Sequence, residues 1–114
     1  MVLNMNELKA KLIQIVKLDI HGFMTDYSAV RVKEVLESDH AVCMVPGEEY
    51  DAILVSSPLY PVEVGKRSAG WVFSDKKERF PDGHFIDIGT TQTIAEPIDG
   101  LKLLSTKRTT YLVI

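Results

Sequence analysis

The segment from residue 69 to residue 91, AGWVFSDKKERFPDGHFIDIGTT, constrains the fold more than any other part of the chain. Its first arm carries Trp71 among apolar neighbours, and aromatic and β-branched residues suit a half-buried strand. In the second arm, Ile86 and Ile88 recur at the two-residue period of one strand face. A Phe-Pro-Asp-Gly turn ending at Gly83 separates the arms. We therefore predict a β-hairpin in which Trp71 is buried and Gly83 has a positive φ.

Apolar residues recur every three or four positions in the N-terminal third, which predicts helices. Residues 4–18 fit an amphipathic helix, although the β-branched residues within 12–20 leave a strand as the alternative. A second helix should extend to about Ser38, so that the helical part covers about residues 4–38. Its candidate caps are Thr25, Asp26 and Ser28. Its buried stripe should contain Ala29, Val32, Val35 and Leu36.

Short apolar runs bounded by Pro, Gly and Ser predict strands from residue 41 onward. Residues 41–45 and 52–55 should both be buried strands. The turn-like residues 46–51 between them are long enough for a hairpin connection, which would make these two strands antiparallel neighbours. Residues 59–64 contain a proline, so they should form an edge strand or a crossing.

The last two predicted strands, residues 101–105 and 109–114, complete the fold class. The second of them is apolar on both faces, so we place it centrally in the sheet. Because the helices precede the strands instead of alternating with them, we predict an α+β fold. One or two N-terminal helices should pack on a mainly antiparallel sheet of about five to seven strands, with residues 1–114 forming a single domain.

The cysteine count and the charge distribution indicate in which compartment the protein works and what it can bind. A single Cys43 excludes an intramolecular disulfide and favours a reducing compartment, which predicts a cytoplasmic protein. No signal peptide or membrane-spanning run is visible in the 114 residues.

The net charge of −3 is uneven: residues 1–65 hold five basic and ten acidic side chains, and residues 66–114 hold eight basic and six acidic side chains. The acidic first half argues against general DNA binding, whereas the basic second half suits one local anionic contact.

Several short motifs in residues 69–114 form a pattern. They are Gly-Trp-Val at 70–72, Asp75, Arg-Phe-Pro-Asp-Gly-His at 79–84, Ile86, and then Thr106, Arg108 and Tyr-Leu-Val at 111–113. This pattern resembles short, uncharacterised bacterial and prophage-borne proteins, in which a hairpin is followed by a closing Thr-x-x-x-Tyr strand. The chain departs from them at residues 87–90, where a basic residue and then Thr-Ser would be typical. The resemblance implies no activity, but it points to mobile-element accessory proteins, many of which bind host factors.

Few residue combinations point to catalysis. His40 and Cys43 are spaced His-x-x-Cys, and His84 or Asp87, with His21 as a further candidate, could complete a metal site. Structural zinc sites usually have paired ligands at both ends, so we expect Cys43 to be a small buried residue in a strand and not a ligand or nucleophile. The Ser-Ser pair has no Gly-x-Ser-x-Gly context, and there is no GxGxxG or Walker loop. We predict no catalytic residue, no metal ligand and no cofactor.

Basic and aromatic residues near the hairpin connection and the final turn remain as candidates for binding. They are Lys76, Lys77, Arg79, Phe80, His84 and Arg108. Arginine forks and aromatic faces suit an anionic, stackable ligand such as a nucleotide. The mixed charges of residues 75–78 also fit a solvated loop without a ligand.

Three functions from different classes are compatible with the sequence. We favour a non-enzymatic interaction protein, of the phage or mobile-element accessory kind, that docks on a host partner. Such a protein would work as a homodimer, because the exposed sheet edges of small domains tend to be paired or covered. The alternative is a small anionic-ligand or nucleotide-binding module, and the second alternative is a small hydrolase or metal-dependent enzyme.

Overall fold

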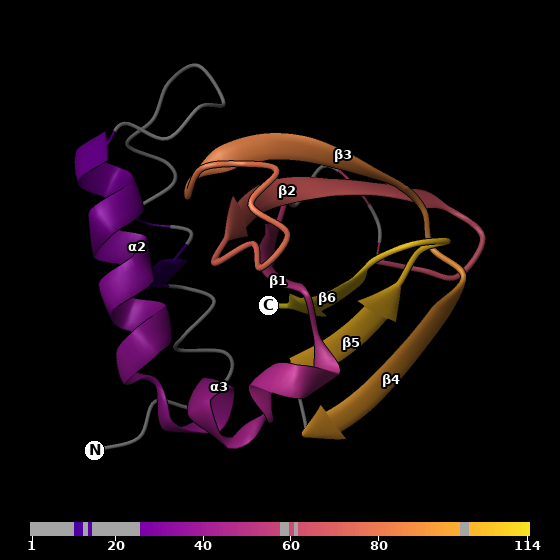
Figure 1. Ribbon diagram of the computed structural model, residues 1–114, viewed down its shortest axis with the longest axis horizontal. Coiled ribbons are helices and arrows are strands. Elements are labelled where there is room, and N and C mark those ends of the chain that lie inside the picture. Colours follow the sequence, from indigo (N-terminus) through magenta and orange to yellow (C-terminus); the bar gives the residue numbers. More distant parts are fainter. Residues whose placement is uncertain (1–10, 13, 15–25, 58–59, 61, 99–100) are drawn as a thin grey trace.

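The computed structural model in Figure 1 describes residues 11, 12, 14, 26–57, 60, 62–98 and 101–114. Apart from the helical residues 11, 12 and 14, these residues form one long helix, one short helix, a 3-10 turn and a six-stranded sheet. The helical elements are α2 (Asp26–Ser38), α3 (His40–Met44) and the turn η1 (Gly47–Glu49). The strands are β1 (Ala52–Ser56), β2 (Arg67–Phe73), β3 (His84–Thr90), β4 (Thr93–Ile98), β5 (Leu101–Ser105) and β6 (Thr110–Val113).

Helix α2 confirms the second predicted helix, because it begins at Asp26 and ends at Ser38. Its predicted stripe faces inward: Ala29, Val32 and Leu36 are buried, and Val35 is partly buried. Of the element predicted for residues 4–18, residues 11, 12 and 14 are helical. The rest of that element lies outside the described residues. Within the described ranges, no helix is both long and apolar enough to cross a membrane.

The six strands lie in the order β3-β2-β1-β6-β5-β4. Every neighbouring pair is antiparallel except β1 and β6, which are parallel, so the sheet is mixed and dominates the described structure. Strand β6 lies between β1 and β5, which confirms the central position predicted for residues 109–114. Its Tyr111, Leu112 and Val113 are all buried, as expected for a strand that is apolar on both faces.

The predicted hairpin is confirmed, since β2 and β3 pair in antiparallel register with Trp71 opposite Phe85. The Trp71 side chain is buried, with 6% of the residue exposed, and its ring meets that of Phe85 edge to face at 5.1 Å between centroids. Gly83 has φ 87°, as predicted, and its N–H donates to the carbonyl of Val72 at 2.7 Å. The connection between the two arms is long, covering residues 74–83.

The strand predicted at residues 41–45 is wrong, because residues 40–44 form helix α3. Asp39 favours the helix: its carboxylate accepts the backbone N–H of Val42 at 3.0 Å, which is the hydrogen bond of a helix N-cap. A five-residue apolar run fits a buried helical turn as well as a strand, so periodicity could not separate the two. The predicted antiparallel pairing of this run with β1 is therefore wrong as well, and β1 pairs with β2 and β6 instead.

Strand β4 was not predicted from the sequence. Pro97 lowers the strand propensity of the segment, but a proline is tolerated on an edge strand or at a bulge. Strand β4 is an edge strand, and its register with β5 shifts between Ala95 and Ile98, next to Pro97. The crossing predicted for residues 59–64 is consistent with residues 62–64, which lie outside any strand between β1 and β2.

The sheet is rolled because of the joint between β3 and β4. These strands lie at opposite edges of the sheet, yet only Thr91 and Gln92 separate them in the chain. In a flat six-stranded sheet the two edges would be about 24 Å apart. Three residue steps, from Thr90 to Thr93, reach about 11 Å at most. In Figure 1, β3 accordingly bends directly into β4 on the side of the sheet away from α2.

Backbone hydrogen bonds close this joint. The Thr91 N–H donates to the carbonyl of Lys66 at 3.0 Å, and the Thr91 carbonyl accepts the N–H of Gly65 at 2.8 Å. The next residue, Gln92, donates to the carbonyl of Ser105 at 2.8 Å. The joint therefore links the start of β2 to the end of β5, which are far apart in the strand order.

Apolar residues fill both faces of the rolled sheet. The first cluster combines α2 and α3 with one face and includes Val32, Leu36, Val42, Ile53, Trp71, Phe73 and Leu112. The second cluster lies on alternate strand positions and includes Ala52, Leu54, Val72, Ile86, Ile88, Leu104, Tyr111 and Val113. Strand residues alternate between faces, so neighbours such as Ile53 and Leu54 belong to different clusters.

We expect Trp71→Ala to lower the free energy of unfolding by about 3–5 kcal/mol, because it removes a large aromatic side chain from the first cluster. Equilibrium denaturation in urea measures this loss. Val30→Ala is the control, since Val30 lies on α2 with 56% of the residue exposed, and it should change stability by less than about 0.5 kcal/mol. A loss below about 1 kcal/mol for Trp71→Ala would contradict its place in the core.

Candidate functional site

The connection between β2 and β3 is organised by Asp75, whose side chain is fully buried. The Arg79 guanidinium donates to both carboxylate oxygens, from Nε at 3.1 Å and from Nη2 at 3.2 Å. The backbone N–H groups of Lys77 and Arg79 donate to the same carboxylate at 3.1 Å and 3.0 Å. Ser74 and Glu78 adopt left-handed backbone conformations, both with φ 53°, which let the chain turn tightly around Asp75.

The ion pair changes the titration of both partners. Burial alone would raise the pKa of Asp75, but the hydrogen bonds from the Arg79 side chain and from two backbone N–H groups outweigh burial and lower it. The pKa of Arg79 is raised, chiefly by its hydrogen bond to Asp75, with a smaller contribution from Tyr111. The connection is therefore held by a charge-assisted fork, which is a strong type of hydrogen bond.

Two basic side chains join this connection to the final turn. Arg79 Nη1 donates to the hydroxyl of Thr109 at 3.1 Å, and Lys77 Nζ donates to the same oxygen at 3.2 Å. Lys77 Nζ also donates to the carbonyl of Arg108 at 2.7 Å and lies 3.8 Å from the carboxylate of Asp51. These cations therefore already have partners within the protein.

Lys76 points to a different part of the molecule. Its ammonium donates to the carbonyls of Gly47 and Tyr50, at 2.7 Å for Tyr50, and lies 4.2 Å from the centre of the Tyr50 ring. Its backbone N–H donates to the carbonyl of Asp51 at 2.8 Å. Lys76 thus fixes the β2–β3 connection to the segment that leads from α3 into β1.

Asp82 joins the same connection to helix α2. Its carboxylate accepts the Ser74 N–H at 2.7 Å and the Lys33 ammonium at 2.7 Å. Burial alone would raise the pKa of Asp82, but the bonds from Lys33 and Ser74 outweigh it, so the pKa is lowered. The pKa of Lys33 is raised, chiefly by its hydrogen bond to Asp82.

The six predicted binding residues do not form one site. Lys77 and Arg79 converge on Thr109 beside Arg108, whereas Lys76 points toward Tyr50. The side chain of Arg108 is exposed and has no hydrogen bond or ion pair with any described residue. Phe80 is exposed, with the Arg79 guanidinium 5.4 Å from its ring centre. His84 is exposed at the start of β3.

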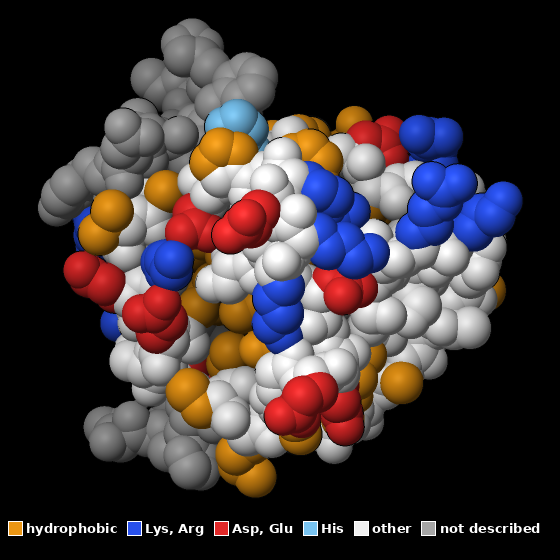
Figure 2. Space-filling model, in the orientation of Figure 1, with side chains coloured by type: hydrophobic (Ala, Val, Ile, Leu, Met, Phe, Trp, Pro, Cys, Tyr) orange, Lys and Arg blue, Asp and Glu red, His pale blue; other side chains and the backbone are white. Residues whose placement is uncertain are grey.

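Sequence reasoning missed a pocket between α2, α3 and the sheet. It has a volume of about 370 Å³, and Figure 2 shows hydrophobic side chains in a hollow on this face with acidic and basic side chains around it. Its apolar lining consists of Leu36, Val42, Val45, Ile53 and Phe73. Its polar lining consists of Lys33, Glu37, Cys43, Gly47, Tyr50, Ser74 and Lys76. Two of the lining residues, Val42 and Cys43, belong to helix α3. Because residues 41–45 were predicted to be a strand, the sequence did not indicate this pocket.

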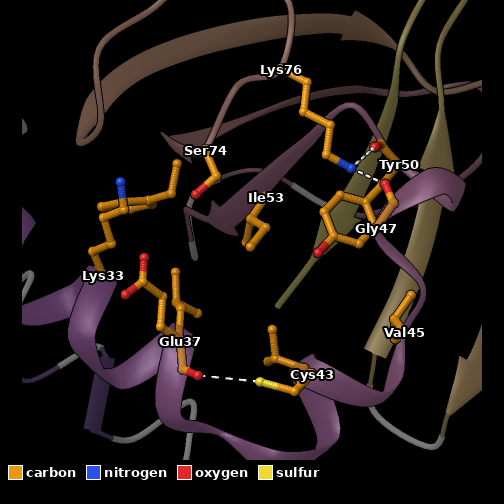
Figure 3. A pocket seen from close by; sticks show the side chains of 12 residues that line it. Lys33, Glu37, Cys43, Val45, Gly47, Tyr50, Ile53, Ser74 and Lys76 are labelled. Atoms are coloured by element: carbon orange, nitrogen blue, oxygen red, sulfur yellow. Dashed lines mark hydrogen bonds between the residues drawn. The ribbon is translucent and has the colours of Figure 1, made fainter.

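Cys43 lies in the lining of this pocket and is exposed, so the buried strand position expected for it is wrong. Its thiol donates to the backbone carbonyl of Glu37 at 3.2 Å (Figure 3). Burial raises the pKa of the nearby Tyr50, with a further contribution from Cys43. Among the residues that the structure describes, no group of three or more His, Cys, Asp and Glu side chains could hold a metal ion.

The fold and the pocket define a small, sheet-rich protein with an apolar cavity bordered by charged side chains. No protein-family model matches the chain, and no solved structure matches it. The chain is 34% identical over 94 residues to an uncharacterised 12.8 kDa protein in the cd-pseT intergenic region of Enterobacteria phage T4, and the match covers 82% of each chain. The chain therefore belongs to the family of this phage protein. This agrees with the predicted relation to short, uncharacterised prophage-borne proteins, whereas the motifs in residues 69–114 stay a prediction.

We expect Arg79→Ala to lower the free energy of unfolding by about 1–3 kcal/mol, because the buried carboxylate of Asp75 would keep only its two backbone donors. Arg108→Ala is the matched control, and it should change stability by less than about 0.5 kcal/mol because its side chain is exposed. Urea denaturation of both variants at pH 7 measures the difference. Equal effects of the two changes would contradict the structural role of Arg79.

We also expect acid to destabilise the fold through Asp75 and Asp82. Their pKa values are lower in the folded protein than in the unfolded chain, so their contribution is complete above the unfolded value of about 3.9 and is lost as pH falls through the folded values. Asp82→Asn should lower stability at pH 7 and reduce the further loss between pH 5 and pH 2. Lys33→Gln should reduce that loss too, because it removes the cation that lowers the pKa of Asp82. Unfolding curves at several pH values measure this, and an unchanged pH profile in both variants would contradict it.

Proposed function

We propose that this protein is a non-enzymatic accessory protein of a phage that works by docking on a protein partner of the host. Its family membership supports this proposal, because the relative is a phage protein. The observation that carries the proposal is the pocket between α2, α3 and the sheet, with its apolar floor and charged border. At protein interfaces, the anchoring side chains of a partner are typically buried in well-packed pockets.

The docking surface we propose is centred on this pocket and not on the turn that the sequence first indicated. Of the predicted binding residues, Lys76 lines the pocket. Arg79 and Lys77 instead hold the β2–β3 connection, which carries both Lys76 and Ser74 into the pocket lining. We therefore assign Arg79 and Lys77 a positioning role and Lys76 a contact role. Arg108, Phe80 and His84 would contact only a partner that extends beyond the pocket.

A homodimer is also part of this proposal. The sheet edges are poor surfaces for it, because β4 carries Pro97 with a register shift and β3 carries a register shift near Gly89. Prolines and bulges at edges are features that prevent strand pairing between molecules. These features weaken the argument that exposed edges require a homodimer, and light scattering on a size-exclusion column measures whether one forms.

The second candidate is a small anionic-ligand or nucleotide-binding module. The exposed side chain of Arg108, which has no partner among the described residues, favours it. The neighbouring Lys77 and Arg79 would add positive charge, although both are already bonded to protein groups. A nucleotide panel in a thermal-shift assay tests this candidate: a rise in Tm that Arg108→Ala abolishes would support it.

We expect Cys43→Trp to abolish partner binding, because an indole at this exposed position would fill the pocket without disturbing the buried core. Met44→Trp is the matched control. Met44 is the next residue on α3 and is 59% exposed, and it does not line the pocket. Affinity purification with each tagged variant, followed by quantitative mass spectrometry, measures which proteins are lost. If Cys43→Trp retains every partner that Met44→Trp retains, docking at the pocket is wrong.

A further inference from the structure

The pocket carries an uncompensated positive charge on one side. Lys76 Nζ bonds to two backbone carbonyls, those of Gly47 and Tyr50, and lies over the Tyr50 ring. All three are neutral groups. Within the part of the chain that the structure describes, the Lys76 ammonium therefore has no anionic partner.

The opposite side of the pocket, formed by α2, carries the Glu37 carboxylate, which has no hydrogen-bond donor among the described residues. Lys33 and Glu37 both line this side (Figure 3), and Lys33 is already paired with Asp82 at 2.7 Å. The Glu37 carboxylate forms no hydrogen bond or ion pair with any residue in the described ranges, although it is close enough to contribute to the raised pKa of Lys33. Glu37 therefore offers a free acceptor to an occupant of the pocket.

The apolar floor lies between these two charges. In Figure 3, Ile53 lies between Glu37 on the α2 side and Lys76 with Tyr50 on the other side. A volume of about 370 Å³ accommodates one large apolar side chain with part of its main chain. An occupant that uses the whole pocket must therefore be apolar in the middle and carry opposite charges at its two ends.

We infer that the occupant is a peptide segment of the partner protein with one apolar anchor residue, an acidic residue that reaches Lys76 and a basic residue that reaches Glu37. This inference rests on the proposed docking function and specifies the partner's chemistry. A small apolar anion would satisfy Lys76 but would also face the carboxylate of Glu37. A peptide can separate its two charges by the width of the pocket, so charge complementarity favours a peptide.

A random peptide library displayed on messenger RNA tests the inference when it is selected against the immobilised full chain. The readout is the amino-acid preference on each side of the apolar position in the enriched peptides. With the wild-type chain, we expect an acidic residue on one side and a basic residue on the other. Lys76→Gln should abolish the acidic preference, and Glu37→Gln should abolish the basic preference. Each change should weaken the enriched wild-type peptides by about twofold to fivefold, as partly exposed ion pairs do.

Three further variants complete the experiment. Glu34→Gln and Lys107→Gln are matched controls at exposed charges outside the pocket, and they should leave both preferences unchanged. Cys43→Trp should weaken the peptides by about tenfold or more, since it fills the space of the anchor. Thermal unfolding of each variant confirms that it folds. Because Lys76→Gln keeps an N–H donor for the carbonyls of Gly47 and Tyr50, it should melt near the wild-type temperature.

The inference is overturned if no peptide is enriched, if Cys43→Trp binds the enriched peptides as tightly as the wild type, or if neither preference responds to Lys76→Gln or Glu37→Gln. Its failure can be told apart from that of the proposed function. Cellular partners that Cys43→Trp loses, combined with peptides that show no charge preference, would overturn the inference and leave docking intact. Charge-patterned peptides, combined with cellular partners that Cys43→Trp retains, would overturn the docking function.

Discussion

The short joint of Thr91 and Gln92 determines the shape of the molecule. A sheet whose two edge strands are consecutive in the chain, with two residues between them, cannot remain flat. Alternate residues of each strand point to opposite faces. In the rolled sheet, both faces of the central strands β1, β2 and β6 are buried. This explains why β6 can be apolar on both sides although the described helices contribute only to the first cluster. The joint also buries Thr91, whose hydroxyl has no partner among the described residues.

The charged side chains of the β2–β3 connection mostly serve to hold it in place. Asp75 is surrounded by donors from its own loop, and Asp82 bonds the loop to α2. Lys77 bonds it to the final turn, and Lys76 to the segment before β1. The connection thereby contacts three separate elements, and one wall of the pocket has a fixed position. The pocket depends on this network as much as on the apolar residues of its floor.

Local patterns predicted the hairpin and α2 well. They failed at one ambiguous apolar run and where contacts between distant residues determine the structure. Trp71 and Gly83 have strong local preferences, and both were predicted correctly. The apolar run at residues 41–45 has no such preference, and its helix is capped by the Asp39 carboxylate, which accepts the Val42 N–H. The sequence identified Lys76 as a binding candidate, but the pocket combines residues from α2, α3, β1 and β2, and no linear pattern joins these. The basic residues of the loop were read as ligand contacts, because their internal partners at Thr109 and Tyr50 lie 26 to 32 positions away.

The parallel pairing of β1 with β6 has a consequence for how the chain folds. Ala52 pairs with Tyr111 and Leu54 with Val113, so the two strands at the centre of the sheet come from opposite ends of its sequence. The β2–β3 hairpin can form early from neighbouring residues, but the centre must wait until residue 113 has been synthesised. Long-range pairings of this kind slow folding, because the chain loses the entropy of a long loop before the contacts form. During synthesis, the edge of β1 that pairs with β6 is therefore unpaired until β6 has been made. A nascent chain in this state is the form most exposed to aggregation or chaperone binding.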